Sequence, residues 1–113
     1  MRIWDVDVGC LCDQHLLGEH RELHAIWTVL TESRRGYARH PETLRWRGRL
    51  AALYRRHDEE VAEMARRGFR HGSPLDAALA TGGAEQTELV DPLDVQRARL
   101  AAKDCGCARP PTG

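Results

Sequence analysis

The sequence contains a single lysine, Lys103, against 16 arginines, and its 17 basic residues are balanced by 17 acidic ones. It also lacks long apolar runs: none approaches the roughly 18 residues that a membrane-spanning helix needs. The first dozen residues carry acids where a signal peptide has a basic and then an apolar stretch, so we expect a cytoplasmic protein with no membrane partner. Aromatic residues make up only 5% of the chain, but 42% hydrophobic residues suffice for a core and exclude a disordered chain.

The formal net charge of zero is the sum of three blocks of different sign. Residues 1–33 hold two arginines against six acids, residues 34–70 hold 11 arginines against five acids, and residues 71–113 hold four basic residues against six acids. Zero net charge argues against a uniformly basic nucleic-acid binder, yet the middle block is basic enough to follow a phosphate backbone. The alternative for this block is a solvated helix surface, because the acids at 58–63 can pair with arginines one helical turn away.

Three arginines of the middle block, Arg45, Arg47 and Arg49, have no acid nearby after Glu42 and are its best candidates for contacts to DNA. Trp46 lies among them and is a candidate wedge or stacking platform beside an extruded base. The alternative is that Trp46 belongs to the core, which is the commoner place for a tryptophan on a helix.

Apolar spacing of three and four residues predicts an all-α fold, a single compact domain of three main helices with an extended N-terminus. The expected helices run from Asp13 as N-cap to about Ser33, from within Pro41–Leu44 to about Arg67, and from Asp91-Pro92 to about Lys103. Residues 71–91 are rich in small and polar residues and predict a loop with a short helical turn at 75–80. We expect residues 1–104 to form the domain and residues 105–113 to form a tail rich in cysteine and proline.

Cysteine and histidine offer two candidate metal sites. The pairs Cys10/Cys12 and Cys105/Cys107 provide four thiolates for zinc if the chain ends meet, and the alternative is free or buried thiols. His20 and His24 lie four residues apart and form a candidate metal pair, but His20 falls on the apolar stripe, which favours a hydrogen-bonded core histidine. We expect no cofactor, with zinc as the alternative.

The first expected helix presents His15, Glu19 and Glu22 on one face, because they are spaced by four and three residues. Carboxylates beside an apolar stripe are candidates for acid–base chemistry, and the alternative is a solvated charged face.

Four blocks of the sequence, in the same order along the chain, carry a resemblance to a known family. They are Arg2-Ile3; Asp13-Gln14-His15-Leu16 with Glu19-x-Arg21-Glu22-Leu23; Arg56 to Phe69; and Ala98-Arg99-Leu100 with Lys103. Together they resemble the pyrimidine-dimer DNA glycosylases and abasic-site lyases of the phage endonuclease V type. The resemblance implies a DNA repair enzyme, acting on double-stranded DNA with damaged or abasic sites as a monomer, in a bacterial-type, nucleoid-associated cytoplasmic setting.

The resemblance also implies roles for particular residues. The α-amine of Met1 would attack the sugar C1′ and form a Schiff base, and Glu22 would serve as the acid–base carboxylate. The implied contacts to DNA are Arg2, Gln14, His15, Arg21, Arg99 and Lys103. The single lysine suits this chemistry, because an α-amine is neutral at a lower pH than a lysine side chain.

Three departures from the family pattern are visible. Met1 stands where the phage enzyme has a threonine, Ala25 stands where it has an arginine, and its tyrosine-rich C-terminal segment is missing. The alternative function is a non-catalytic module of the same fold that binds DNA or another partner and is stabilised by zinc.

Overall fold

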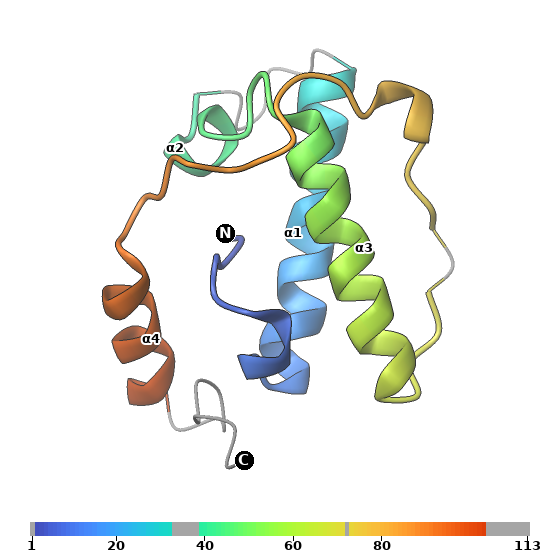
Figure 1. Cartoon of the computed structure of the whole chain (residues 1–113). Coiled ribbons are helices and arrows are strands. Elements are labelled where there is room, and N and C mark those ends of the chain that lie inside the picture. Colours follow the sequence, from blue (N-terminus) through green and yellow to red (C-terminus); the bar gives the residue numbers. More distant parts are fainter. Residues whose placement is uncertain (1, 33–38, 72, 104–113) are drawn as a thin grey trace.

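The computed structural model describes residues 2–32, 39–71 and 73–103. It contains four α-helices, α1 (Asp13–Thr31), α2 (Pro41–Leu44), α3 (Leu50–Arg66) and α4 (Leu93–Ala102), and two 3-10 turns, η1 (Val8–Cys10) and η2 (Ala77–Leu79) (Figure 1). The described residues form no β-strand. The all-α prediction with three main helices is therefore confirmed, and η2 falls within the short helical turn expected at 75–80. Among the described residues, no helix combines the length and the apolar character needed to cross a lipid bilayer.

The long helices α1 and α3 lie side by side and run in opposite directions (Figure 1). Leu16, Leu23 and Ile26 of α1 and Leu53 of α3 are almost fully buried, as their helical spacing predicts. Cys12 rather than Asp13 is the N-cap of α1, since its sulfur accepts a hydrogen bond from the backbone nitrogen of His15.

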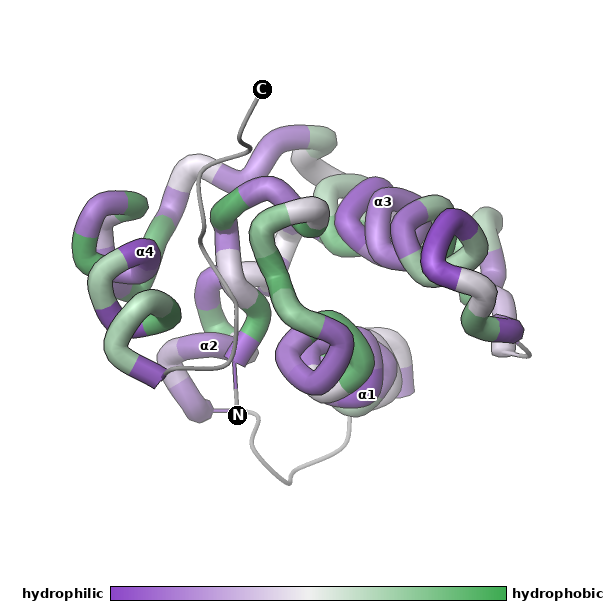
Figure 2. Tube along the Cα trace, turned by 90° about the horizontal axis from the view of Figure 1, so that it is seen from below, coloured by the Kyte–Doolittle hydropathy of each residue, from purple (hydrophilic) through white to green (hydrophobic). Residues whose placement is uncertain are grey.

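The extended N-terminal segment, residues 2–7, runs between α4 and the α1–α3 pair (Figures 1 and 2). Its apolar side chains join both clusters of the core: Trp4 and Val6 pack with Leu16 of α1, and Ile3 packs with Leu53 of α3. The segment thus occupies the centre of the core rather than its surface.

The helix expected over residues 41–67 is interrupted, and this prediction was wrong over residues 45–49. Gly48 adopts a φ of 77°, which favours glycine, and the chain turns before α3 begins at Leu50. Arg49, the N-cap of α3, provides no capping side chain. The backbone nitrogens of Ala51 and Ala52 instead donate to the carbonyl oxygens of residues 81 and 83, at 2.8 and 3.0 Å. The loop before α4 therefore supplies the cap that the local sequence lacks.

Candidate active site

A cavity of about 500 Å³ opens beside the first half of α1. Among the residues that line it are six predicted from the sequence, Arg2, Gln14, His15, Arg21, Glu22 and Lys103. They come from three separate segments: the extended N-terminus, one face of α1 and the C-terminal end of α4. The remaining lining residues are Trp4, Leu17, Gly18 and Glu19.

Glu22 contributes a carboxylate with one unpaired buried oxygen. Its Oε2 atom is buried and accepts no hydrogen bond from any described residue, although the carboxylate lines the cavity. A buried oxygen without a donor costs free energy, about 1–3 kcal/mol for an ordinary group. Such an atom is available to hold or accept a proton from a group that enters the cavity.

The basic groups around the cavity outnumber its unpaired acids. Arg21 and Lys103 both line the cavity. The guanidinium of Arg2 lies 4.2 Å from the centre of the Trp4 ring and also pairs with the Asp91 carboxylate at 2.9 Å. Burial, assisted by the charge of Lys103, lowers the pKa of His15, so the imidazole is neutral at physiological pH. The arrangement suits an anionic ligand held near a single carboxylate.

Glu19 also lines the cavity, but its charge is neutralised from within. Arg56 of α3 donates to both of its carboxylate oxygens, with Nε at 2.9 Å and Nη2 at 3.1 Å. Burial raises the pKa of Glu19, and the guanidinium opposes this shift. This pair is part of the scaffold of the site rather than one of its reactive groups.

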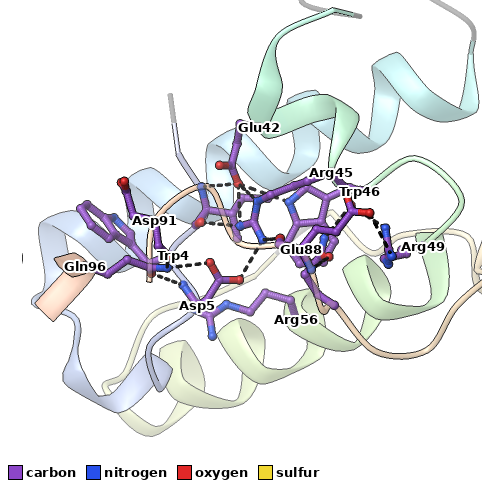
Figure 3. A network of polar contacts seen from close by, with 12 residues as sticks. Trp4, Asp5, Glu42, Arg45, Trp46, Arg49, Arg56, Glu88, Asp91 and Gln96 are labelled. Atoms are coloured by element: carbon purple, nitrogen blue, oxygen red, sulfur yellow. Dashed lines mark hydrogen bonds and ion pairs between the residues drawn. The ribbon is translucent and has the colours of Figure 1, made fainter. Parts of the chain in front are cut away.

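Buried polar groups hold the backbone of the N-terminal segment at one residue after another (Figure 3). The nitrogen of Ile3 donates to Glu42 Oε1 at 3.2 Å, and the carbonyl oxygen of Ile3 accepts from Arg45 Nη2 at 2.8 Å. The nitrogen of Trp4 donates to Glu19 Oε1 at 2.7 Å. Polar side chains also hold two further backbone groups, the nitrogen of Asp5 and the carbonyl oxygen of Val6.

Further along the segment, the nitrogen of Asp5 donates to the side-chain oxygen of Gln96 at 2.8 Å. The Asp5 carboxylate accepts from Arg45 at 2.9 Å and from Gln96 at 3.0 Å. The carbonyl oxygen of Val6 accepts from Arg56 at 2.9 Å. Groups from α1, α2, α3 and α4 therefore fix the course of the chain that leads into the cavity through Arg2.

The structure places two predicted DNA contacts inside the protein. The side chain of Arg45 is 4% exposed and bonds the N-terminal segment, and Trp46 is 2% exposed and donates from its indole nitrogen to Glu42 at 3.3 Å. Their burial corrects the expectation of DNA contact for these two residues and favours the core alternative for Trp46. Arg49 is half-buried beside Glu88, whereas Arg47 is exposed and remains available for a phosphate.

Other predicted residues lie outside the cavity or outside the described residues. Arg99 is exposed on α4, 3.8 Å from the Asp91 carboxylate that also pairs with Arg2. Met1 lies outside the described residues, as do Cys105 and Cys107 and the expected tail. The sulfur of Cys12 is 3.1 Å from Nδ1 of His15, so it is already engaged at the edge of the site.

A larger cavity of about 760 Å³ lies beside residues 84–89 and shares only Trp4 with the smaller one. Its lining includes the carboxylates of Asp5, Asp7, Glu59 and Glu85, and one of its two arginines is the Arg56 that pairs with Glu19. An acidic lining repels phosphate, so the smaller cavity is the better candidate for an anionic substrate.

Sequence reasoning missed the partners that organise the site. It identified Glu19 by its helical position but not Arg56, Glu42 or Gln96, whose side chains reach residues 37 to 91 positions away. It also considered His20 and His24 without His57 and His71. His20 is a buried histidine that bonds Glu60 at 2.8 Å, as the core alternative predicted, and its ring also contacts those of His24, His57 and His71.

Comparison with known proteins connects this geometry to one family. A family model described as pyrimidine dimer DNA glycosylase matches residues 1–77, which include the N-terminal segment, α1 and α3. A search of the curated proteins and of the solved structures finds no match to the chain.

Proposed function

Because the chain belongs to the pyrimidine dimer DNA glycosylase family, we propose that it excises a damaged pyrimidine and cleaves the resulting abasic site by β-elimination. The proposal assigns the nucleophile to the α-amine of Met1 and the acid–base role to Glu22. The observation that carries it is the cavity, which is lined by Arg2, the residue bonded to Met1, and by Glu22, together with Arg21 and Lys103. The buried Oε2 atom of Glu22 accepts no hydrogen bond from a described residue.

In the proposed reaction, the neutral amine forms a bond to the sugar C1′, and the bond between C1′ and the base breaks. Transfer of a proton to the ring oxygen then opens the sugar and leaves a Schiff base between the amine and C1′. Glu22 assists this opening and afterwards removes a proton from C2′. The electron pair of that C–H bond expels the 3′ phosphate, so the strand is cut by β-elimination.

The composition and the fold both favour an α-amine as nucleophile. An α-amine has a reference pKa of about 7.7–8.0, against about 10.4 for lysine, so a larger fraction is neutral near pH 7. Lys103, the single lysine, is exposed at the C-terminal end of α4, and its ammonium group suits a phosphate better than a sugar carbon. The buried bonds to residues 3–6 fix the backbone that follows Met1, which supports the proposal because a nucleophile needs a defined approach to the sugar.

Trapping with borohydride tests the nucleophile directly. We expect the full chain, mixed with a duplex that carries one abasic site, to give a covalent adduct whose peptide map places the DNA on Met1. Acetylation of the N-terminus should abolish the adduct. The matched control is Lys103→Arg, which keeps the charge but removes the only side-chain primary amine and should leave the adduct intact. An adduct on Lys103, or no adduct with a free N-terminus, would contradict the proposal.

Phosphate binding by the cavity gives a further prediction. We expect Arg21→Ala with Lys103→Ala to reduce the slope of log affinity against log salt by about 2, since each lost phosphate contact removes about 0.9. Fluorescence anisotropy with a labelled abasic duplex at several salt concentrations measures the slope. Arg55→Ala is the control, because Arg55 is exposed beside the larger, acidic cavity. Equal slopes for the double variant and the unmodified protein would exclude these two residues as phosphate contacts.

A further inference from the structure

Four histidines converge between α1 and α3, and none of them lines the candidate active site. His20 and His24 are one helical turn apart on α1, His57 belongs to α3, and His71 follows that helix. Glu22 comes between His20 and His24 in the sequence. Each residue of an α-helix advances about 100° around the axis, so Glu22, two residues after His20, points roughly 200° away from it. The cluster and the cavity with Glu22 thus use different faces of α1.

The ring nitrogens of the cluster are spaced as ligands of one ion would be. The Nε2 atoms of His20 and His24 are 3.1 Å apart, and those of His57 and His71 are 3.2 Å apart. One ring nitrogen from each of the four lies within 4.8 Å of all the others. Zinc–nitrogen bonds of 2.0–2.1 Å in a tetrahedron require ligand atoms about 3.3 Å apart, so small side-chain movements suffice to close the site.

The protonation of the cluster agrees with metal binding. Burial, with the nearby imidazoles, lowers the pKa of His24 to about 4. Burial also lowers the pKa values of His20, His57 and His71. At neutral pH the four rings are therefore uncharged and have lone pairs to offer, as metal ligands must.

A buried carboxylate sets the orientation of one ring. Nδ1 of His20 lies 2.8 Å from Glu60 Oε1, and a proton on Nδ1 leaves the lone pair of Nε2 directed into the cluster. Histidines that bind zinc through one ring nitrogen commonly donate the N–H of the other ring nitrogen to a carboxylate.

We propose that His20, His24, His57 and His71 bind one divalent transition-metal ion, of which zinc fits best, and that the ion fastens α1 to α3 and to the chain after α3. The alternative is a hydrogen bond between His20 and His24 and another between His57 and His71. Each bond would satisfy one ring N–H, but neither explains why the two pairs lie against each other. Four protein ligands fill a tetrahedral shell, which is the arrangement of a structural rather than a catalytic zinc site. A cavity of about 470 Å³ lined by His20, His24 and His71 provides an entry path.

The test is a zinc titration of the full chain after treatment with a chelator. We expect one equivalent to bind and the melting temperature to rise with zinc concentration, because the ion binds the folded state. His24→Ala with His71→Ala should weaken binding at least 100-fold and remove the thermal shift. Glu60→Gln, which keeps all four ligands, should weaken binding about 10- to 100-fold. His40→Ala is the control, because His40 is exposed and lies outside the cluster.

Cobalt substitution separates this site from a thiolate site. Cobalt bound to four imidazoles should show tetrahedral absorption in the visible range without a thiolate charge-transfer band, and Cys105→Ser with Cys107→Ser should leave both spectrum and stoichiometry unchanged. Circular dichroism of each variant without metal establishes that it is folded before binding is compared. Absence of stoichiometric zinc, or zinc that is lost with the two cysteines and retained without His24 and His71, would overturn the proposal. Strand cleavage is not a readout, so this result stands apart from the proposed enzymatic activity.

Discussion

Glu22→Gln is expected to lose strand cleavage at abasic sites by about 10²- to 10⁴-fold, the usual contribution of a general acid–base group. Glutamine preserves the size of the side chain but cannot remove the C2′ proton. Because Glu22 Oε2 accepts no hydrogen bond from the described residues, the substitution breaks no internal contact of that atom, and stability should change little. Single-turnover cleavage of a labelled abasic duplex measures the effect.

The same variant separates proton transfer from the formation of the covalent bond. Its α-amine is untouched, so E22Q should still be trapped by borohydride while it cleaves slowly. Glu59→Gln is the matched control, since Glu59 is exposed on α3 and does not line the candidate cavity, and it should cleave normally. Cleavage by E22Q within a few-fold of the unmodified protein would remove Glu22 from the mechanism.

Arg56→Met is expected to lower the free energy of unfolding by about 3–5 kcal/mol, the cost of leaving one partner of a buried ion pair alone. Arg56 bonds both oxygens of Glu19 and also the carbonyl oxygen of Val6. Its loss removes the donors to Glu19 Oε2 and to the Val6 carbonyl oxygen, whereas Glu19 Oε1 still accepts from the nitrogen of Trp4. Urea denaturation followed by circular dichroism measures the change. This loss is a large fraction of the stability of a domain of this size.

A double variant tests whether the stranded charge causes the loss. Glu19→Met combined with Arg56→Met removes both charges and should regain much of the stability, although the backbone nitrogen of Trp4 then lacks its acceptor, at a cost of about 1–3 kcal/mol. Arg66→Met is the control, because Arg66 is largely exposed and its pairing with Glu63 should contribute less than about 1 kcal/mol. If the double variant is no more stable than R56M, the unpaired charge of Glu19 is not the cause, and the loss of stability comes from the lost packing of the Arg56 side chain.

The sequence was sufficient for those features that depend on local spacing. The positions of α1, α3 and α4 follow from apolar periodicity, and the residues at the cavity follow from one face of α1 together with a family resemblance. The break in the helix at Gly48 was not predicted. The start of α3 depends on carbonyl oxygens of residues 81 and 83, which belong to a loop distant in the sequence. The apolar spacing of the sequence does not change at this break, so it does not reveal where one helix ends and the next begins.

Buried charge was the second limit of sequence reasoning. Arg45 was interpreted as a DNA contact because no acid follows it closely, but its partners Glu42 and Asp5 precede it, one within a helical turn and the other 40 residues away. The four histidines show the same limit: a spacing of four revealed two of them, whereas the packing of α1 against α3 supplied the rest. Long-range pairing of polar groups cannot be deduced from spacing along one chain.

The bonds that hold residues 3–6 also bear on how the protein folds. They join positions 15, 39, 50 and 91 residues apart in the chain, whereas most hydrogen bonds of a helical protein join residues within one turn. Folding slows as contacts become less local, because the entropy of loop closure is lost before such contacts form. The bond between the nitrogen of Asp5 and Gln96 can form only after α4 has been synthesised and has docked. The segment at residues 3–6 therefore completes its contacts late in folding, although it precedes all four helices in the chain.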